Sequence, residues 1–78
     1  MSKQRIGIIG AGSFGTALAK VFYEAGNQVQ IWAREAEIVT HINAHHTNHK
    51  YLPDLNLPDT VRAMSKLSDI VQEKDLLV

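Results

Sequence analysis

The sequence predicts an α/β fold with parallel strands, and three observations near its start support this. A β-branched run at Arg5–Ile9 is followed at once by glycines, an apolar stripe of helical period runs through Ser13–Ala25, and Val29–Trp32 alternates apolar with polar residues after Gln28. Two strands joined through one helix lie parallel, with a right-handed crossover. We therefore expect the first 32 residues to form a βαβ unit.

The expected helix over residues 13–25 carries its large apolar residues on one stripe, which we expect to face the core. The stripe consists of Phe14, Ala17, Leu18, Val21, Phe22 and Ala25. Gly26 follows at the position where many helices end in a left-handed residue.

The rest of the chain predicts further alternation of helices and strands. In order, we expect a helix from Glu35 to about Ala44, a loop over His45–Asp59, a short strand at Val61–Met64, a brief helix near Leu67–Val71 and a fourth strand starting at Asp75. The leucines that precede Pro53 and Pro58 are expected to hold the loop on the core.

Composition excludes several classes of protein. The chain of 78 residues has no cysteine, so disulfides, zinc fingers, iron–sulfur clusters and thiol nucleophiles are absent. Eight basic residues balance eight acidic ones, which gives no electrostatic reason to expect nucleic acid or anionic lipid as a partner. No segment is long enough to span a membrane.

The stretch between Arg5 and Lys20 is uncharged and contains Ala17-Leu18-Ala19, so a secretory leader is one alternative. Its glycines at 7, 10, 12 and 15 argue against it, because they interrupt a helical apolar segment. We expect a cytoplasmic protein.

The motif with the clearest chemistry is Gly10-Ala11-Gly12-Ser13-Phe14-Gly15, which has the form G-x-G-x-x-G. It follows an expected strand and opens an expected helix, the context in which this motif binds a dinucleotide pyrophosphate. Gly10 permits the tight turn, Gly12 leaves room for the anion and Gly15 lets helix and strand pack closely. Backbone N–H groups near Ser13 and Phe14 then point at the anion. We predict a Rossmann-type unit, the alternative being a glycine turn without a ligand.

The end of the expected second strand bears on the choice of cofactor. An NAD-binding unit usually has an acidic residue there to hold the ribose 2′-hydroxyl, whereas this chain has Arg34. A guanidinium suits a 2′-phosphate, so NADP (as NADPH) is favoured. Glu35 could still supply the carboxylate, so NAD stays open, as does an ordinary surface role for Arg34.

Other candidate residues have simpler explanations. His41 and His45 are one helical turn apart and could face a cation, but no acidic residue or cysteine joins them at ligand spacing, and we expect no metal site. Trp32 and Tyr51 could flank an adenine, although packing is the commoner role for such aromatics. No set of catalytic residues is visible.

The last residues, Asp75-Leu76-Leu77-Val78, begin an apolar strand, and a buried parallel strand needs cover on both faces. We therefore expect an incomplete sheet, cut at its fourth strand. Residues 1–78 would be the N-terminal portion of a dinucleotide-binding domain, with the substrate domain absent from this chain. A small non-catalytic dinucleotide-binding module is the alternative.

Several segments resemble, in order, the NAD(P)-dependent glycerol-3-phosphate dehydrogenases of the bacterial type. Ile8–Ala19 resembles their opening, and the likeness continues through Ile31–Arg34, Asn43, Tyr51-Leu52-Pro53, Leu57-Pro58 and residues 75–78. Many dehydrogenases share the glycine motif, whereas G-T-A-L-A, W-A-R and Y-L-P at these spacings are more specific.

The resemblance implies an enzyme that interconverts dihydroxyacetone phosphate and sn-glycerol 3-phosphate by hydride transfer, for glycerophospholipid synthesis, with a homodimer as one form of the complete enzyme. By the family pattern, Ser13, Phe14, Arg34 and Tyr51 contact the cofactor, while the three motif glycines shape the turn. The catalytic lysine of such enzymes lies beyond Val78, so no residue here receives a catalytic role and we expect this portion alone to be inactive. Another NADP-linked reductase with a Rossmann N-terminus is the alternative enzyme.

Overall fold

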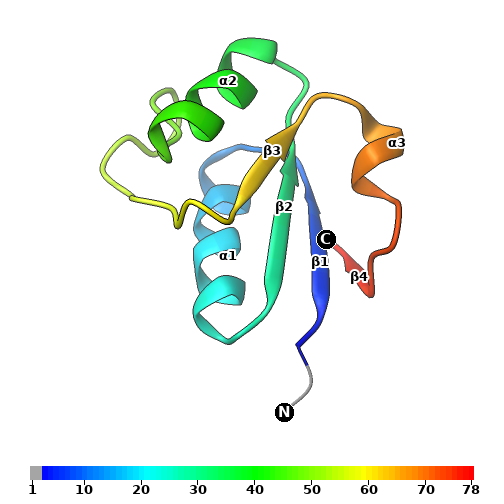
Figure 1. Cartoon of the computed structure of the whole chain (residues 1–78). Coiled ribbons are helices and arrows are strands. Elements are labelled where there is room, and N and C mark those ends of the chain that lie inside the picture. Colours follow the sequence, from blue (N-terminus) through cyan, green and yellow to red (C-terminus); the bar gives the residue numbers. More distant parts are fainter. Residues whose placement is uncertain (1–2) are drawn as a thin grey trace.

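The structure is a computed structural model that describes residues 3–78, in which strands and helices alternate around one parallel sheet (Figure 1). The elements are β1 (Arg5–Ile9), α1 (Ser13–Glu24), β2 (Gln28–Trp32), α2 (Ala36–His45), β3 (Arg62–Met64), α3 (Leu67–Ile70) and β4 (Leu76–Leu77). The sheet order is β3-β2-β1-β4, and every neighbouring pair is parallel. The predicted α/β fold class is thereby confirmed.

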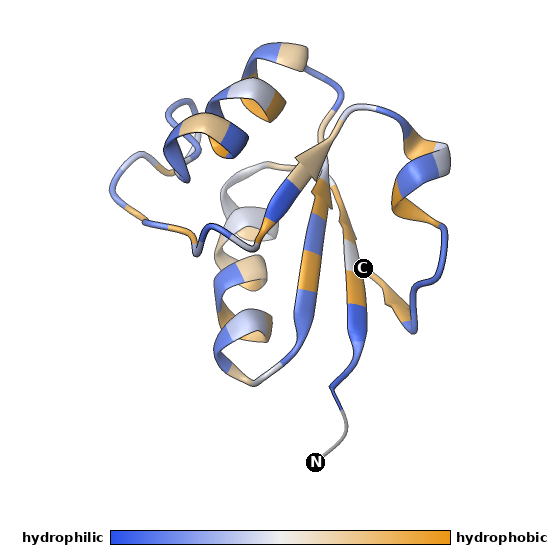
Figure 2. Ribbon diagram, viewed as in Figure 1, coloured by the Kyte–Doolittle hydropathy of each residue, from blue (hydrophilic) through white to orange (hydrophobic). Residues whose placement is uncertain are grey.

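The core lies between the sheet and helices α1 and α2. Val29 and Ile31 on β2 are buried and lie on one face of the strand, while Gln28 is exposed and Gln30 half-buried on the other. In Figure 2 the apolar residues gather on the central strands and on the inner sides of the helices. On β1, Ile6 and Ile8 join this core, whereas the strand's last residue, Ile9, is 43% exposed.

The expected apolar stripe of α1 is confirmed only in part, because Leu18 and Phe22 pack against the core while other members of the stripe are exposed. Phe14 and Val21 are 77% and 58% exposed, whereas the buried residues of the helix are Thr16 and Ala19. A Cβ atom added at Gly15 would overlap the carbonyl oxygen of Gly10, so the helix rests on the sheet through its smallest residues. Close approach of the two backbones therefore decides which face is buried, rather than side-chain size.

The remaining elements lie within one or two residues of their expected bounds. Helix α1 ends at Glu24, and Gly26 takes the expected left-handed conformation with φ 97°. Helix α2 ends where His46 adopts φ 61°. In the following loop, Leu57 is buried and Leu55 packs against the core, while Leu52 is half-buried.

Among residues 3–78, no helix combines the length and the apolar character needed to cross a membrane.

Candidate functional site

The glycine turn lies at the carboxyl ends of β1 and β2. Gly10 has φ 124°, and its N–H donates to the carbonyl oxygen of Trp32 at 2.9 Å. Such a positive φ is easy only for glycine. Gly12 is different, because it has φ −77° and a Cβ added there would meet no heavy atom within 4 Å. The space in front of Gly12 is therefore open to an approaching ligand.

The first turn of α1 has the features of an anion-binding helix N-terminus. Gly12 is the N-cap residue, no side chain caps the helix and no acidic residue lies in the first turn. The N–H of Thr16 makes the first bond of the helix, to the carbonyl oxygen of Gly12 at 3.0 Å. The N–H groups before it lie at the positive end of the helix dipole, which stabilises bound phosphate.

Two of the predicted contact residues meet across this turn. The Ser13 hydroxyl donates to the backbone carbonyl oxygen of Tyr51 at 2.9 Å. Phe14, the next residue of α1, is exposed, and Tyr51 is 40% exposed. The structure thus brings the loop after α2 against the start of α1, and it leaves both aromatic side chains accessible beside the glycine turn.

A fully buried asparagine holds this arrangement together. The side-chain amide of Asn48 donates to the carbonyl oxygen of Ala11 at 2.6 Å and to the Thr16 hydroxyl at 3.0 Å, and its oxygen accepts the N–H of Tyr51 at 3.3 Å. One side chain therefore joins the glycine turn, α1 and the Tyr51 loop. Sequence analysis missed Asn48, because its partners lie far from it in the chain and no local pattern indicates them.

The residues after β2 form a second group. Arg34 is exposed at the bend that leads to Glu35, the N-cap residue of α2. The Glu35 Oε2 atom lies 3.5 Å from the Lys50 Nζ and accepts the Tyr51 hydroxyl at 3.4 Å. The pKa of Lys50 is raised by electrostatic interaction with Tyr51 and by hydrogen bonding to Glu35. Trp32, which could have flanked an adenine, donates its indole N–H to the Ser65 carbonyl oxygen at 3.0 Å.

Three histidines cluster at the end of α2. The ring of His41 lies with its centroid 4.7 Å from that of His45 and 4.0 Å from that of His49, and its Nε2 is 2.9 Å from the Thr47 hydroxyl. Partial burial, together with the nearby His49 and His45, lowers the pKa of His41. Within residues 3–78 no group of three or more histidine and acidic side chains is placed to hold a metal ion.

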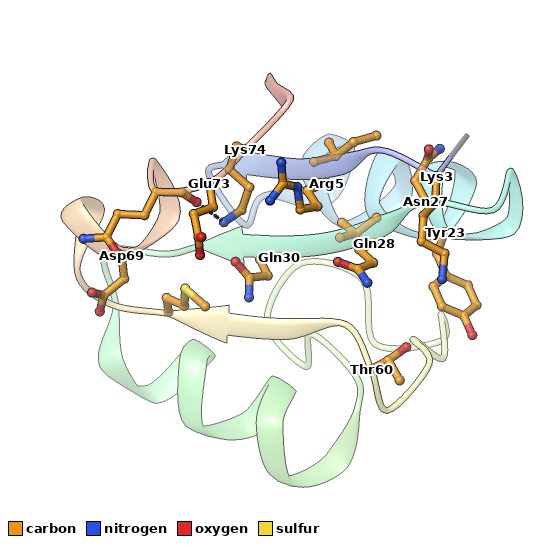
Figure 3. Close-up of a pocket in the computed structure, with 14 residues that line it drawn as sticks. Lys3, Arg5, Tyr23, Asn27, Gln28, Gln30, Thr60, Asp69, Glu73 and Lys74 are labelled. Carbon is orange, nitrogen blue, oxygen red and sulfur yellow. Dashed lines mark hydrogen bonds between the residues drawn. The ribbon is translucent and has the colours of Figure 1, made fainter. Parts of the chain in front are cut away.

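A groove lies on another part of the surface. With a volume of about 670 Å³, it runs along the sheet face that carries Gln28 and Gln30, and Figure 3 shows both side chains pointing into it with Arg5 and Lys74 above them. Its lining includes none of the predicted cofactor contacts, and it mixes basic with acidic side chains. The groove is therefore separate from the glycine turn, and sequence analysis did not predict it.

Residues 5–78 match the family described as the N-terminus of NAD-dependent glycerol-3-phosphate dehydrogenase. The chain belongs to this family. Among curated glycerol-3-phosphate dehydrogenases (NAD(P)+), it is 47% identical to that of Leptospira biflexa over 95% of its own residues and 44% identical to that of Corynebacterium aurimucosum over 94%. It spans only 22% of the length of either relative.

Solved structures of the same family agree with the fold. The crystal structure of the Coxiella burnetii glycerol-3-phosphate dehydrogenase superimposes with a TM-score of 0.87 at 36% identity, over 96% of this chain and 23% of that one. The Saccharomyces cerevisiae enzyme gives 0.85 at 32% identity, over 97% of this chain and 25% of that one. The resemblance predicted from sequence is confirmed.

Proposed function

We propose that this chain seats the dinucleotide cofactor of a glycerol-3-phosphate dehydrogenase that interconverts dihydroxyacetone phosphate and sn-glycerol 3-phosphate with NAD(P)H. The observation that carries the proposal is the open glycine turn at the uncapped start of α1, because a pyrophosphate needs both room and unpaired N–H groups. Membership of the dehydrogenase family supports the same reading.

In this proposal each predicted residue contacts or accommodates a different part of the cofactor. Gly10 forms the turn, Gly12 leaves the approach open and Gly15 brings α1 onto β1, as their geometry supports. Ser13 and Phe14 present the first N–H groups of the helix to the pyrophosphate. Arg34 and Tyr51 contact the adenosine half of the cofactor from the end of β2 and from the neighbouring loop.

We favour NADPH over NADH because of Arg34, while the curated relatives are named for NAD(P)+. Residues 1–78 would be the N-terminal portion of the dinucleotide-binding domain, with a substrate domain elsewhere in a longer protein. That complete enzyme would act in the cytoplasm, in glycerophospholipid synthesis, as a homodimer.

Replacing Gly12 by valine in the complete protein tests the proposal. The fold has room for the new side chain, so the variant should fold, although valine is a poorer N-cap residue than glycine and should cost about 1 kcal/mol of stability. The side chain would occupy the pyrophosphate position and weaken NADH and NADPH by more than about tenfold. Fluorescence titration of both cofactors and reduction of dihydroxyacetone phosphate are the measurements. Ala25→Val, at the exposed far end of the same helix, is the matched control. Unchanged cofactor affinity in Gly12→Val would contradict the proposed site.

A further inference from the structure

The end of β2 carries an acidic residue whose role the cofactor proposal leaves open. The Trp32 carbonyl oxygen accepts the Gly10 N–H, so the residues that follow Trp32 leave the sheet beside the glycine turn. Glu35 is three positions further on, at the start of α2. In this kind of fold an acidic side chain beyond the second strand binds the ribose 2′-hydroxyl, and its negative charge repels a 2′-phosphate.

The carboxylate of Glu35 contacts two side chains of the loop after α2. Lys50 Nζ lies 3.5 Å and the Tyr51 hydroxyl 3.4 Å from the same oxygen, Oε2. The Lys50 ammonium also lies 5.3 Å from the centre of the Tyr51 ring. Because Tyr51 is in turn bonded through its carbonyl oxygen to Ser13, these contacts continue from the glycine turn to the end of β2.

We propose that the Lys50–Glu35 ion pair sets the preference between NADPH and NADH at this site, an inference that rests on the proposed function. Lys50 neutralises the carboxylate and holds it on the loop, so that Arg34 provides the net charge next to the adenosine ribose. Without Lys50, Glu35 is free to bind a ribose hydroxyl and to repel a 2′-phosphate. Without the charge of Glu35, Lys50 becomes a second cation for that phosphate.

The charges therefore predict opposite effects for the two partners. In the complete protein, Lys50→Met should lower the ratio of NADPH to NADH affinity by roughly three- to fivefold, and Glu35→Gln should raise it by a similar factor, as for exposed charges. The double variant regains the net charge of the unmodified site, so its ratio should return close to the original. Raising the salt to about 1 M should shrink all these differences, because the Debye length falls to about 3 Å.

Two controls separate this effect from general changes in charge. Glu37→Gln removes a carboxylate from the same turn of α2, and Lys3→Met removes an ammonium near the opposite end of the sheet. Both residues are exposed, and neither variant should alter the ratio. Since both side chains of the Lys50–Glu35 pair remain partly exposed to solvent, its loss should hardly change the unfolding midpoint.

The dissociation constants of NADPH and NADH, measured by fluorescence titration, decide the outcome. Opposite shifts in the two single variants, with recovery in the double variant, support the proposal. Equal ratios in all variants, or shifts in the same direction, overturn it while leaving the cofactor site in place. If the unmodified complete protein binds neither dinucleotide, the proposed function fails first and this inference falls with it.

Discussion

At the scale of single residues, Asn48 is the side chain on which the site geometry depends most. It is fully buried, and its amide group serves three partners that belong to separate segments. A buried polar group of this kind is costly to leave without its partners. The same network that stabilises the fold therefore fixes the distance between the glycine turn and Tyr51.

We predict that Asn48→Ala destabilises the complete protein by about 1–3 kcal/mol, because the Ala11 carbonyl and the Thr16 hydroxyl lose a buried donor. Cofactor affinity should also fall at a temperature where the variant is still folded. Urea denaturation and cofactor titration are the measurements. Asn56→Ala, an exposed position in the same loop, should change neither quantity. Full stability with normal affinity in Asn48→Ala would show that the network is dispensable.

Arg34 carries the second prediction at this scale. Arg34→Ala should weaken NADPH by about 1–3 kcal/mol, the range for a charge-assisted contact, and should hardly affect NADH, which lacks the 2′-phosphate. The ratio of the two dissociation constants is the relevant measurement. Arg62→Ala, an exposed arginine on the edge strand β3, serves as the control. Equal losses for both cofactors would contradict a contact with the 2′-phosphate.

At the scale of elements, the loop after α2 is the part that joins otherwise separate pieces. The loop contains Asn48, which bonds to the glycine turn and to α1, and it also supplies Lys50 and Tyr51. It then reaches β3 by way of the buried Leu57. Asn43 on α2 fastens the other end, since its amide pairs with both backbone groups of Ala63 on β3, at 2.8 and 3.0 Å. The loop is therefore held at each end, and its anchors explain why it can present site residues.

The histidines beside this loop predict a dependence of stability on pH. The pKa of His41 is lower in the folded state than in the unfolded chain. Near and below the ordinary histidine pKa, the unfolded chain therefore binds more protons than the folded one. The free energy of unfolding should be highest above the ordinary histidine pKa of about 6.5 and should decrease as the pH falls below it. His41→Gln, which keeps a polar partner for Thr47, should flatten this decrease. Urea midpoints between about pH 5 and 8 provide the test, and identical slopes for both proteins would refute it.

At the scale of the whole molecule, the order of elements could be predicted from local patterns, while their contacts could not. Alternation at Val29 and Ile31 and the glycines after Ile9 are visible in short windows of sequence, and the βαβ unit follows from them. The exposure of Phe14 and Val21 on α1 was not predicted, because the close approach of Gly15 to the glycine turn and β1 turns the small residues Thr16 and Ala19 inward. The role of Asn48 and the groove lined by Gln30 arise from contacts between segments that are distant in the chain, and no local pattern encodes such contacts.

In the candidate site, too, the local features were predictable from sequence and the long-range contacts were not. The glycines of the turn were predictable, because each has a backbone requirement that the motif itself expresses. The bond between Ser13 and Tyr51 and the pairing of Glu35 with Lys50 join residues that lie 38 and 15 positions apart. Their placement follows from the path of the loop after α2, and only the folded chain reveals it. The cofactor contacts of Arg34 and Phe14 stay predictions.

The position of β1 in the sheet has a consequence for protein synthesis. β1 leaves the ribosome first among the strands, yet one of its edges is completed only by the end of this chain, where Asp75 and Val78 bond to Arg5, Gly7 and Ile9. At about 5–20 residues per second, that edge stays open for several seconds of translation. During this interval its free N–H and C=O groups can pair with strands of other chains. The time for which this edge lacks its partner is thus set by the rate of translation.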